Sequence, residues 1–150
     1  MTEAGQITRE SLGAWLLKTS PGPGALPEPD EQGRRIFRER CVSRNYRAEL
    51  MQNGDPVVLW ISGASGGRGP EPGVWGVGRV AAPVGLNSAG QFAVGLDLPV
   101  EAQVLVPRDQ LREDPDLAGL EVLRMPAGSN PSWLTRSQWQ ALQLLLARTA

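Results

Sequence analysis

Few side chains in this sequence can do chemistry near neutral pH. The 150 residues contain no histidine and one cysteine, Cys41, which excludes a Ser-His or Cys-His nucleophile pair and a zinc site of imidazole and thiolate. General acid–base chemistry would need a carboxylate, a lysine or a tyrosine with a shifted pKa. The one plausible set is Lys18 and Thr19 with Asp55 or Glu49. The carboxylates follow no recognisable acid–base spacing, so we expect no catalytic residue, no metal and no cofactor.

Aromatic side chains offer a second kind of chemistry, the stacking of a planar ligand. Trp15, Trp60 and Trp75 lie in segments that we predict to be strands, and Tyr46 begins a predicted helix. Such rings pack in a protein core, where an indole N–H is satisfied from the rim. They also wall pockets in which a nucleobase stacks, at about 1–3 kcal/mol per base. Both interpretations remain open at this stage.

Charge is unevenly distributed, although the formal net charge is only −1. Six arginines lie within fourteen residues, opposed there by Glu39 alone: Arg34, Arg35, Arg38, Arg40, Arg44 and Arg47. The segment 97–121 holds seven acidic residues against Arg108 and Arg112. If these segments occupy different faces, one face is basic and the other acidic. Clustered arginines suit phosphate contacts, but a solvated helix face has the same pattern.

Short predicted strands separated by turns dominate the chain. Proline and glycine make 20–33 a loop, and Gly76 and Gly78 inside a strand indicate a bulge or a close approach. Thr135 and Gln138 have the spacing of a capping box. The predicted strands are 14–18, 56–62, 74–84, 91–100 and 103–106, with an edge strand at 120–123. The predicted helical segments are turns at 34–40 and 108–113, a helix over 45–52, and one from Thr135 to about Arg148. This pattern predicts a small closed β structure with short helices.

The length favours one domain, which would bury about 68–70% of its unfolded surface. We expect a loose lead-in over 1–13 and the domain over 14–150. No apolar run reaches the roughly 18 residues of a membrane-spanning helix, and the polar N-terminus lacks the layout of a secretory signal. We therefore expect a cytoplasmic protein without a membrane partner, and a monomer.

Three segments together resemble the EVE domain of the PUA-like superfamily. They are Trp15-Leu-Leu-Lys18-Thr19, then Arg44-Asn45-Tyr46-Arg47-Ala48 leading to Met51 and Gly54-Asp55, then Leu59-Trp60-Ile61-Ser62-Gly63 followed by Gly73-Val-Trp75-Gly-Val-Gly-Arg79-Val80. The resemblance implies an α+β fold: a curved β pseudobarrel with short peripheral helices and a C-terminal helix. It also implies a noncatalytic module that binds a modified nucleobase turned out of DNA or RNA.

The resemblance assigns roles to particular residues. Trp60 and Tyr46 would wall the base pocket, with Trp15 and Trp75 as further candidates, and Thr19, Ser62 and Gly63 would line it. Asn45 would pair with a base edge, or it caps the helix only. Lys18 would reach a phosphate or an exocyclic oxygen, or it is a surface charge. Arg44 and Arg47 would bind phosphates.

Two other functions remain open from the sequence. One is a small PUA-like hydrolase that acts on a modified nucleoside through Lys18, activated by a lowered pKa. The other is a protein-interaction module.

Overall fold

Two central strands are buried on both faces, and they organise the molecule. The computed structural model describes residues 6–149 except 23 and 65. Strand β1 (Leu12–Thr19) pairs in parallel with β3 (Pro56–Ile61). Successive side chains point to opposite faces, so Trp15 and Leu17 join one core cluster and Leu16 joins the other. Burial on both sides explains why these strands are uninterrupted apolar runs.

The sheet has seven strands and is open. The others are β2 (Arg35–Cys41), β4 (Gly73–Leu86), β5 (Phe92–Val100), β6 (Val106–Pro107) and β7 (Ser132–Thr135). Their order is β2-β5-β4-β3-β1-β7, with β6 beside β4, and every pair but β1–β3 is antiparallel. Among the described residues β2 and β7 end the path, so the expectation of a closed β structure is wrong.

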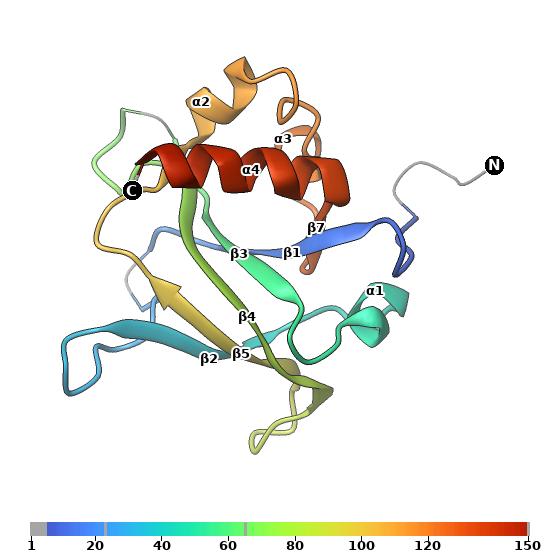
Figure 1. Ribbon diagram of the computed structural model, residues 1–150. Helices are drawn as coiled ribbons and strands as arrows, with labels where there is room; N and C mark the ends of the chain where they lie inside the picture. Colours follow the sequence, from blue (N-terminus) through green and yellow to red (C-terminus); the bar gives the residue numbers. More distant parts are fainter. Residues whose placement is uncertain (1–5, 23, 65, 150) are drawn as a thin grey trace.

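Within the described residues four helices complete the fold: α1 (Tyr46–Leu50), α2 (Arg108–Glu113), α3 (Glu121–Arg124) and α4 (Arg136–Thr149). Figure 1 shows α4 lying across one face of the sheet, with α2 and α3 on the same side. The predicted capping box is confirmed, since the Gln138 N–H donates to Thr135 Oγ1 at 3.2 Å and the Thr135 N–H donates to Gln138 Oε1 at 2.9 Å. Leu142 and Leu145 bury the inner face of α4.

Three local predictions are wrong. The segment 34–40 is not a helical turn, because residues 35–41 form β2, whose pairing with β5 outweighs the helix propensity of its arginines. The segment 120–123 is not an edge strand, since α3 covers 121–124; a short apolar run fits either element. The strand expected over 103–106 is reduced to β6, Val106–Pro107.

Glycines in β4 let β5 cross it closely, as their place inside a predicted strand indicated. A Cβ at Gly76 would overlap the carbonyl oxygen of Pro99, and a Cβ at Gly78 would overlap that of Asp97. Both obstacles are backbone atoms, which cannot move aside as a flexible side chain would.

We predict that Gly76→Ala lowers the free energy of unfolding by about 3 kcal/mol, because β5 must shift to admit the methyl group. The control is Gly85→Ala on the same strand, where nothing lies within 4 Å of an added Cβ; its change should stay within about 0.5 kcal/mol. Urea unfolding of both variants measures the difference. Equal stabilities would contradict the close crossing.

Candidate nucleic-acid interface

The end of β1 meets two loops at a set of contacts that we call the Lys18 junction: Lys18, Arg40, Ser43, Gly128 and Asn130. The Lys18 N–H donates to Asn130 Oδ1 at 2.8 Å, and Asn130 Nδ2 donates to the Lys18 carbonyl at 3.0 Å. Arg40 Nη2 donates to the same carbonyl at 3.1 Å. The Ser43 N–H donates to the Asn130 carbonyl at 2.9 Å. The junction therefore joins β1, the end of β2 and the loop before β7.

The Lys18 ammonium group is held inside this junction. Its Nζ donates to the carbonyl oxygen of Gly128. Burial lowers the pKa of Lys18 from its usual value; the nearby Glu121 carboxylate opposes this shift and the Arg47 guanidinium adds to it. Lys18 is thus a partly buried cation close to a charged pair, which excludes the alternative of an ordinary surface charge.

Arg47, predicted to contact phosphate, is instead committed to a partner within the protein. Its Nη1 and Nη2 donate to the two carboxylate oxygens of Glu121 at 2.7 and 2.8 Å, and Nη1 also donates to the Pro131 carbonyl. Ser132 Oγ donates to the same carboxylate at 2.8 Å. The Arg47 side chain is only 19% exposed. We therefore assign Arg47 a structural role, tying α1 to α3 and β7.

Arg44 lies on the surface beside the junction, and Arg40, which belongs to it, is half-buried. The Arg44 guanidinium lies over the Phe92 ring, 4.8 Å from its centroid, and Arg40 lies 5.7 Å from that of Phe37. A cation above an aromatic face is oriented while its N–H edges remain usable. Arg44 is exposed and is well placed to contact phosphate.

Asn45 and Tyr46 open helix α1 next to Arg44. Asn45 is the N-cap, and its Oδ1 accepts the Ala48 N–H at 3.2 Å. The cap uses the oxygen, so the amide nitrogen is the group that can donate to a base edge. Tyr46 is 45% exposed, and its hydroxyl accepts the Ile7 N–H at 3.0 Å. The tyrosine is therefore anchored toward the segment that precedes β1.

Trp15 and Trp60 do not meet at a common slot. Trp15 is fully buried in the core cluster inside the curved sheet, whereas Trp60 is 3% exposed in the cluster under α4. They lie on opposite faces of the sheet, so they cannot sandwich one base, and we leave both out of the site.

Thr19, Ser62 and Gly63 continue the β1–β3 edge rather than lining the junction. The Ser62 N–H donates to the Thr19 carbonyl at 3.0 Å. Thr19 is 3% exposed, and its hydroxyl donates to the Ala25 carbonyl. Arg108 Nη1 donates to the Gly63 carbonyl at 2.9 Å.

The acid–base set does not assemble either. The Asp55 carboxylate accepts hydrogen bonds from both Arg9 Nη atoms at 2.8 Å, from the Trp15 indole N–H at 2.9 Å and from the Gln52 N–H at 2.9 Å. Burial alone raises the pKa of Asp55, but these donors more than offset it and the pKa lies below its usual value. Asp55 precedes β3 while Lys18 pairs with Trp60 near its end, about 16 Å away along the strand.

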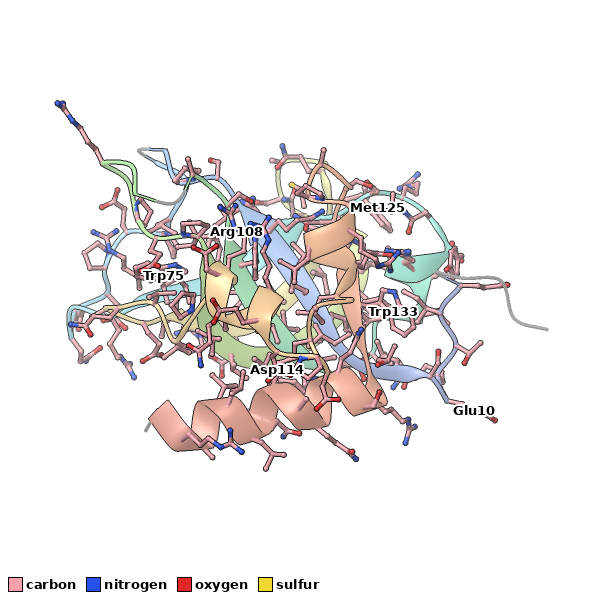
Figure 2. All side chains as sticks on the ribbon, turned by 90° about the horizontal axis from the view of Figure 1, so that it is seen from above. Glu10, Trp75, Arg108, Asp114, Met125 and Trp133 are labelled. Atoms are coloured by element: carbon pink, nitrogen blue, oxygen red, sulfur yellow. The ribbon has the colours of Figure 1, made fainter. Side chains whose placement is uncertain are left out.

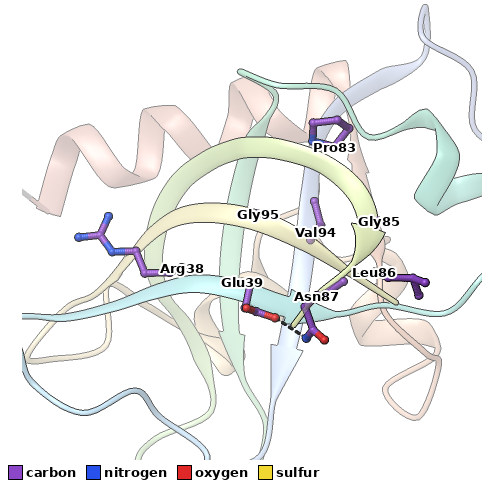
Figure 3. Close-up of a pocket in the computed structure, with 9 residues that line it drawn as sticks. Arg38, Glu39, Pro83, Gly85, Leu86, Asn87, Val94 and Gly95 are labelled. Atoms are coloured by element: carbon purple, nitrogen blue, oxygen red, sulfur yellow. Dashed lines mark hydrogen bonds between the residues drawn. The ribbon is translucent and has the colours of Figure 1, made fainter. Parts of the chain in front are cut away.

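Several concavities lie away from the junction, among them one of about 400 Å³ along β4 and β5. A groove of about 540 Å³ is lined in part by Trp75 and the arginines at the start of β2. Figure 2 shows Trp75 well separated from Met125, which precedes the Gly128–Asn130 loop. A hollow of about 240 Å³ lies between β2, β4 and β5 (Figure 3). There Asn87 Nδ2 donates to Glu39 Oε2 at 2.6 Å, and no residue of the predicted site lines it.

No three His, Cys, Asp or Glu side chains among the described residues gather to hold a metal ion. No helix within 6–149, the two gaps aside, is long and apolar enough to cross a membrane.

No protein-family model and no curated protein matches the chain. Solved structures do match. A protein from Pseudomonas syringae is 19% identical over 89% of this chain and 99% of its own, with a TM-score of 0.64. A hypothetical protein from Leishmania major is 18% identical, covering 94% and 98%, with a TM-score of 0.66. Human THYN1 in complex with DNA containing 5-methylcytosine is 15% identical, covering 91% and 96%, with a TM-score of 0.53.

These similarities establish the fold. The expected α+β, PUA-like fold is confirmed as an unclosed, mixed, seven-stranded sheet with a few helices. In its fold the chain resembles an EVE domain. Human THYN1 shares this fold and has been solved with DNA bound.

The sequence analysis missed Gly128, Asn130 and Glu121 as parts of this region. The dipeptide Asn130-Pro131 is typical of a turn. It predicts a loop, but it does not indicate which part of the protein that loop contacts. Glu121 was placed in an edge strand, and its partner Arg47 lies 74 residues away in sequence, so no local pattern links them.

We predict that Glu121→Gln lowers the free energy of unfolding by about 3 kcal/mol at pH 7, because it leaves the Arg47 charge poorly compensated. Hydrogen bonds from Arg47 and Ser132 outweigh burial and lower the pKa of Glu121. Its contribution is therefore present above its usual pKa and is lost as the pH falls through the lowered folded-state value. Wild-type stability should fall from about pH 5 downward, and the variant should lose part of that dependence.

Urea unfolding at pH 7 and pH 3 measures both effects. The control is Asp109→Asn, which removes a surface pair with Arg112 at 3.8 Å, both side chains being more than half exposed. Its effect should be below about 0.5 kcal/mol. A Glu121→Gln protein with the wild-type pH profile would disprove the assignment.

Proposed function

We propose that this protein is a noncatalytic module that binds nucleic acid at the Lys18 junction and reads there a modified base turned out of its strand. The observation that carries the proposal is that three cationic residues lie at or next to the junction: Lys18 and Arg40 belong to it, and Arg44 follows Ser43. One DNA complex of a protein with this fold, that of human THYN1, supports the choice of ligand.

Electrostatics favours this surface for phosphate. Glu121 is the acidic group beside it, and its charge is matched by Arg47. Lys18, Arg40 and Arg44 therefore give the junction a local excess of positive charge although the chain as a whole is slightly acidic. Phosphate contacts of this kind position a nucleic acid without reading its sequence.

Base reading needs groups with both donors and acceptors. The Asn45 carboxamide and the Lys18 ammonium supply donors, and the Gly128 carbonyl supplies an acceptor. Met125, 56% exposed on the same loop, offers an apolar surface against a base face. Turning a base out of a duplex costs a few kcal/mol, which such contacts would have to offset.

The role of Asn45 can be tested without disturbing the helix. Asn45→Ser retains a good N-cap, so stability should change by less than about 0.5 kcal/mol, but it removes the carboxamide. We expect the preference for a 5-methylcytosine duplex over the matched cytosine duplex to fall at least fivefold in titrations. An unchanged preference would remove Asn45 from the site, and a wild type that binds neither duplex would refute the proposed function.

Arg44→Gln should weaken binding of modified and unmodified duplexes alike. It should also lower the slope of log affinity against log salt concentration by roughly one. The matched control is Arg148→Gln in the last turn of α4, which removes the same charge from the helical side. Affinities measured at several salt concentrations, on DNA and on RNA, give the slopes. Equal slopes for the two variants would place the phosphate contacts elsewhere.

A further inference from the structure

The groove beside Trp75 has the size and shape of a ligand site. Its volume of about 540 Å³ falls within the range of about 300–1,000 Å³ for small-molecule sites. Four segments form it: the loop before β2, the end of β3, the start of β4 and the end of β5. The lining residues used below are Ile61, Trp75, Arg34, Arg35 and Glu101.

Trp75 presents an oriented, partly exposed ring to this groove. Its indole N–H donates to the Glu71 carbonyl at 2.7 Å, which satisfies its polar edge and fixes the ring. Its apolar surface lies partly against the core cluster inside the sheet and partly along the groove. An aromatic face of this kind stacks any base, because every base has a π-face.

Arg34 and Arg35 stand at the rim, and the loop that carries them is preformed. The Asp30 carboxylate accepts the Gln32 and Arg34 N–H groups at 2.9 and 2.8 Å. Arg35 Nη1 donates to the Pro27 carbonyl at 2.7 Å. Two cations face one acidic lining residue, Glu101, whose carboxylate can accept an exocyclic amino group. A ring with guanidinium groups beside it suits a nucleotide.

The groove connects to the Lys18 junction along β2. This strand has Arg35 at its first residue, at the groove, and Arg40 near its end, where it contacts the Lys18 carbonyl. Ile61 in the groove wall pairs with Thr19, the neighbour of Lys18. An extended nucleic-acid strand that follows β2 can therefore contact Arg35 at the groove and Arg40 at the junction.

We propose that the Trp75 groove binds the base of a second, unpaired nucleotide that flanks the one read at the Lys18 junction, with Arg34 and Arg35 on the two phosphates beside it. This inference rests on the proposed function and extends it: the ligand is a nucleic acid with a single-stranded flank. The groove and the junction then act together on one strand.

Three nine-nucleotide DNA strands of equal charge test it. One carries 5-methylcytosine at its centre and thymine elsewhere; the second lacks the central base; the third keeps the central base but has abasic flanks. We expect loss of the flanking bases to weaken wild-type binding at least tenfold. In the Trp75→Leu variant, loss of the flanking bases should weaken binding less than threefold. Equal binding of the first and third strands to the wild type would overturn the inference.

The exposed arginines provide a second variant in case Trp75→Leu does not fold. The double variant Arg34→Gln, Arg35→Gln should lower the salt slope by about 1.4, two phosphate contacts on a single strand, while Arg148→Gln leaves it unchanged. An unaltered slope in the double variant would also overturn the inference. If the strand without the central base binds as well as the complete strand, while the strand with abasic flanks binds more weakly, base reading at the junction is refuted and the groove is not. The two failures are therefore distinguishable.

Discussion

The carboxamide of Asn130 takes the place of a strand at the end of β1, and the Lys18 junction depends on this carboxamide. Strand β7 pairs with β1 only as far as Ser132, opposite Leu16. Pro131 comes before it and has no N–H to continue the ladder. Asn130 instead gives both a donor and an acceptor to the Lys18 backbone, at 3.0 and 2.8 Å. The same residue accepts the Ser43 N–H, so one side chain and its backbone fix two loops beside Lys18.

Much of the fold could be predicted from the sequence wherever the signal was local. The runs around Trp15 and Trp60 are apolar on both faces and became β1 and β3, and Asn45 and Thr135 began the helices that their caps indicated. The segment containing Arg38 failed because its structure is set by pairing with β5, more than fifty residues later in the chain. Local propensity carries no information about such a partner.

The candidate site was harder to predict than the fold, because side chains of the same type lie in different environments. Three tryptophans were assigned to one pocket, yet the parallel register of β1 and β3 sends Trp15 and Trp60 to different faces, and only Trp75 lines a groove. Arg44 and Arg47 are three residues apart in sequence, and one lies over Phe92 at the surface while the other pairs with Glu121. The spacing of residues in the sequence shows which side chains a segment carries. It does not show which of them is buried against a partner far away in the sequence.

The arrangement of charge gives the molecule a direction with respect to a polyanion. Figure 1 places β2, with its arginines, and α2, whose two arginines balance Asp109 and Glu113, on opposite sides of the molecule. A polyanion would be attracted more to the first side than to the second, and such a difference orients an encounter even when the net charge is near zero. Asp97 moderates the first side, lying 3.6 Å from Arg38 and 3.8 Å from Arg79. Charged side chains on an edge strand also discourage pairing with another sheet. The arginines of β2 therefore disfavour pairing of this edge with the strand of another protein.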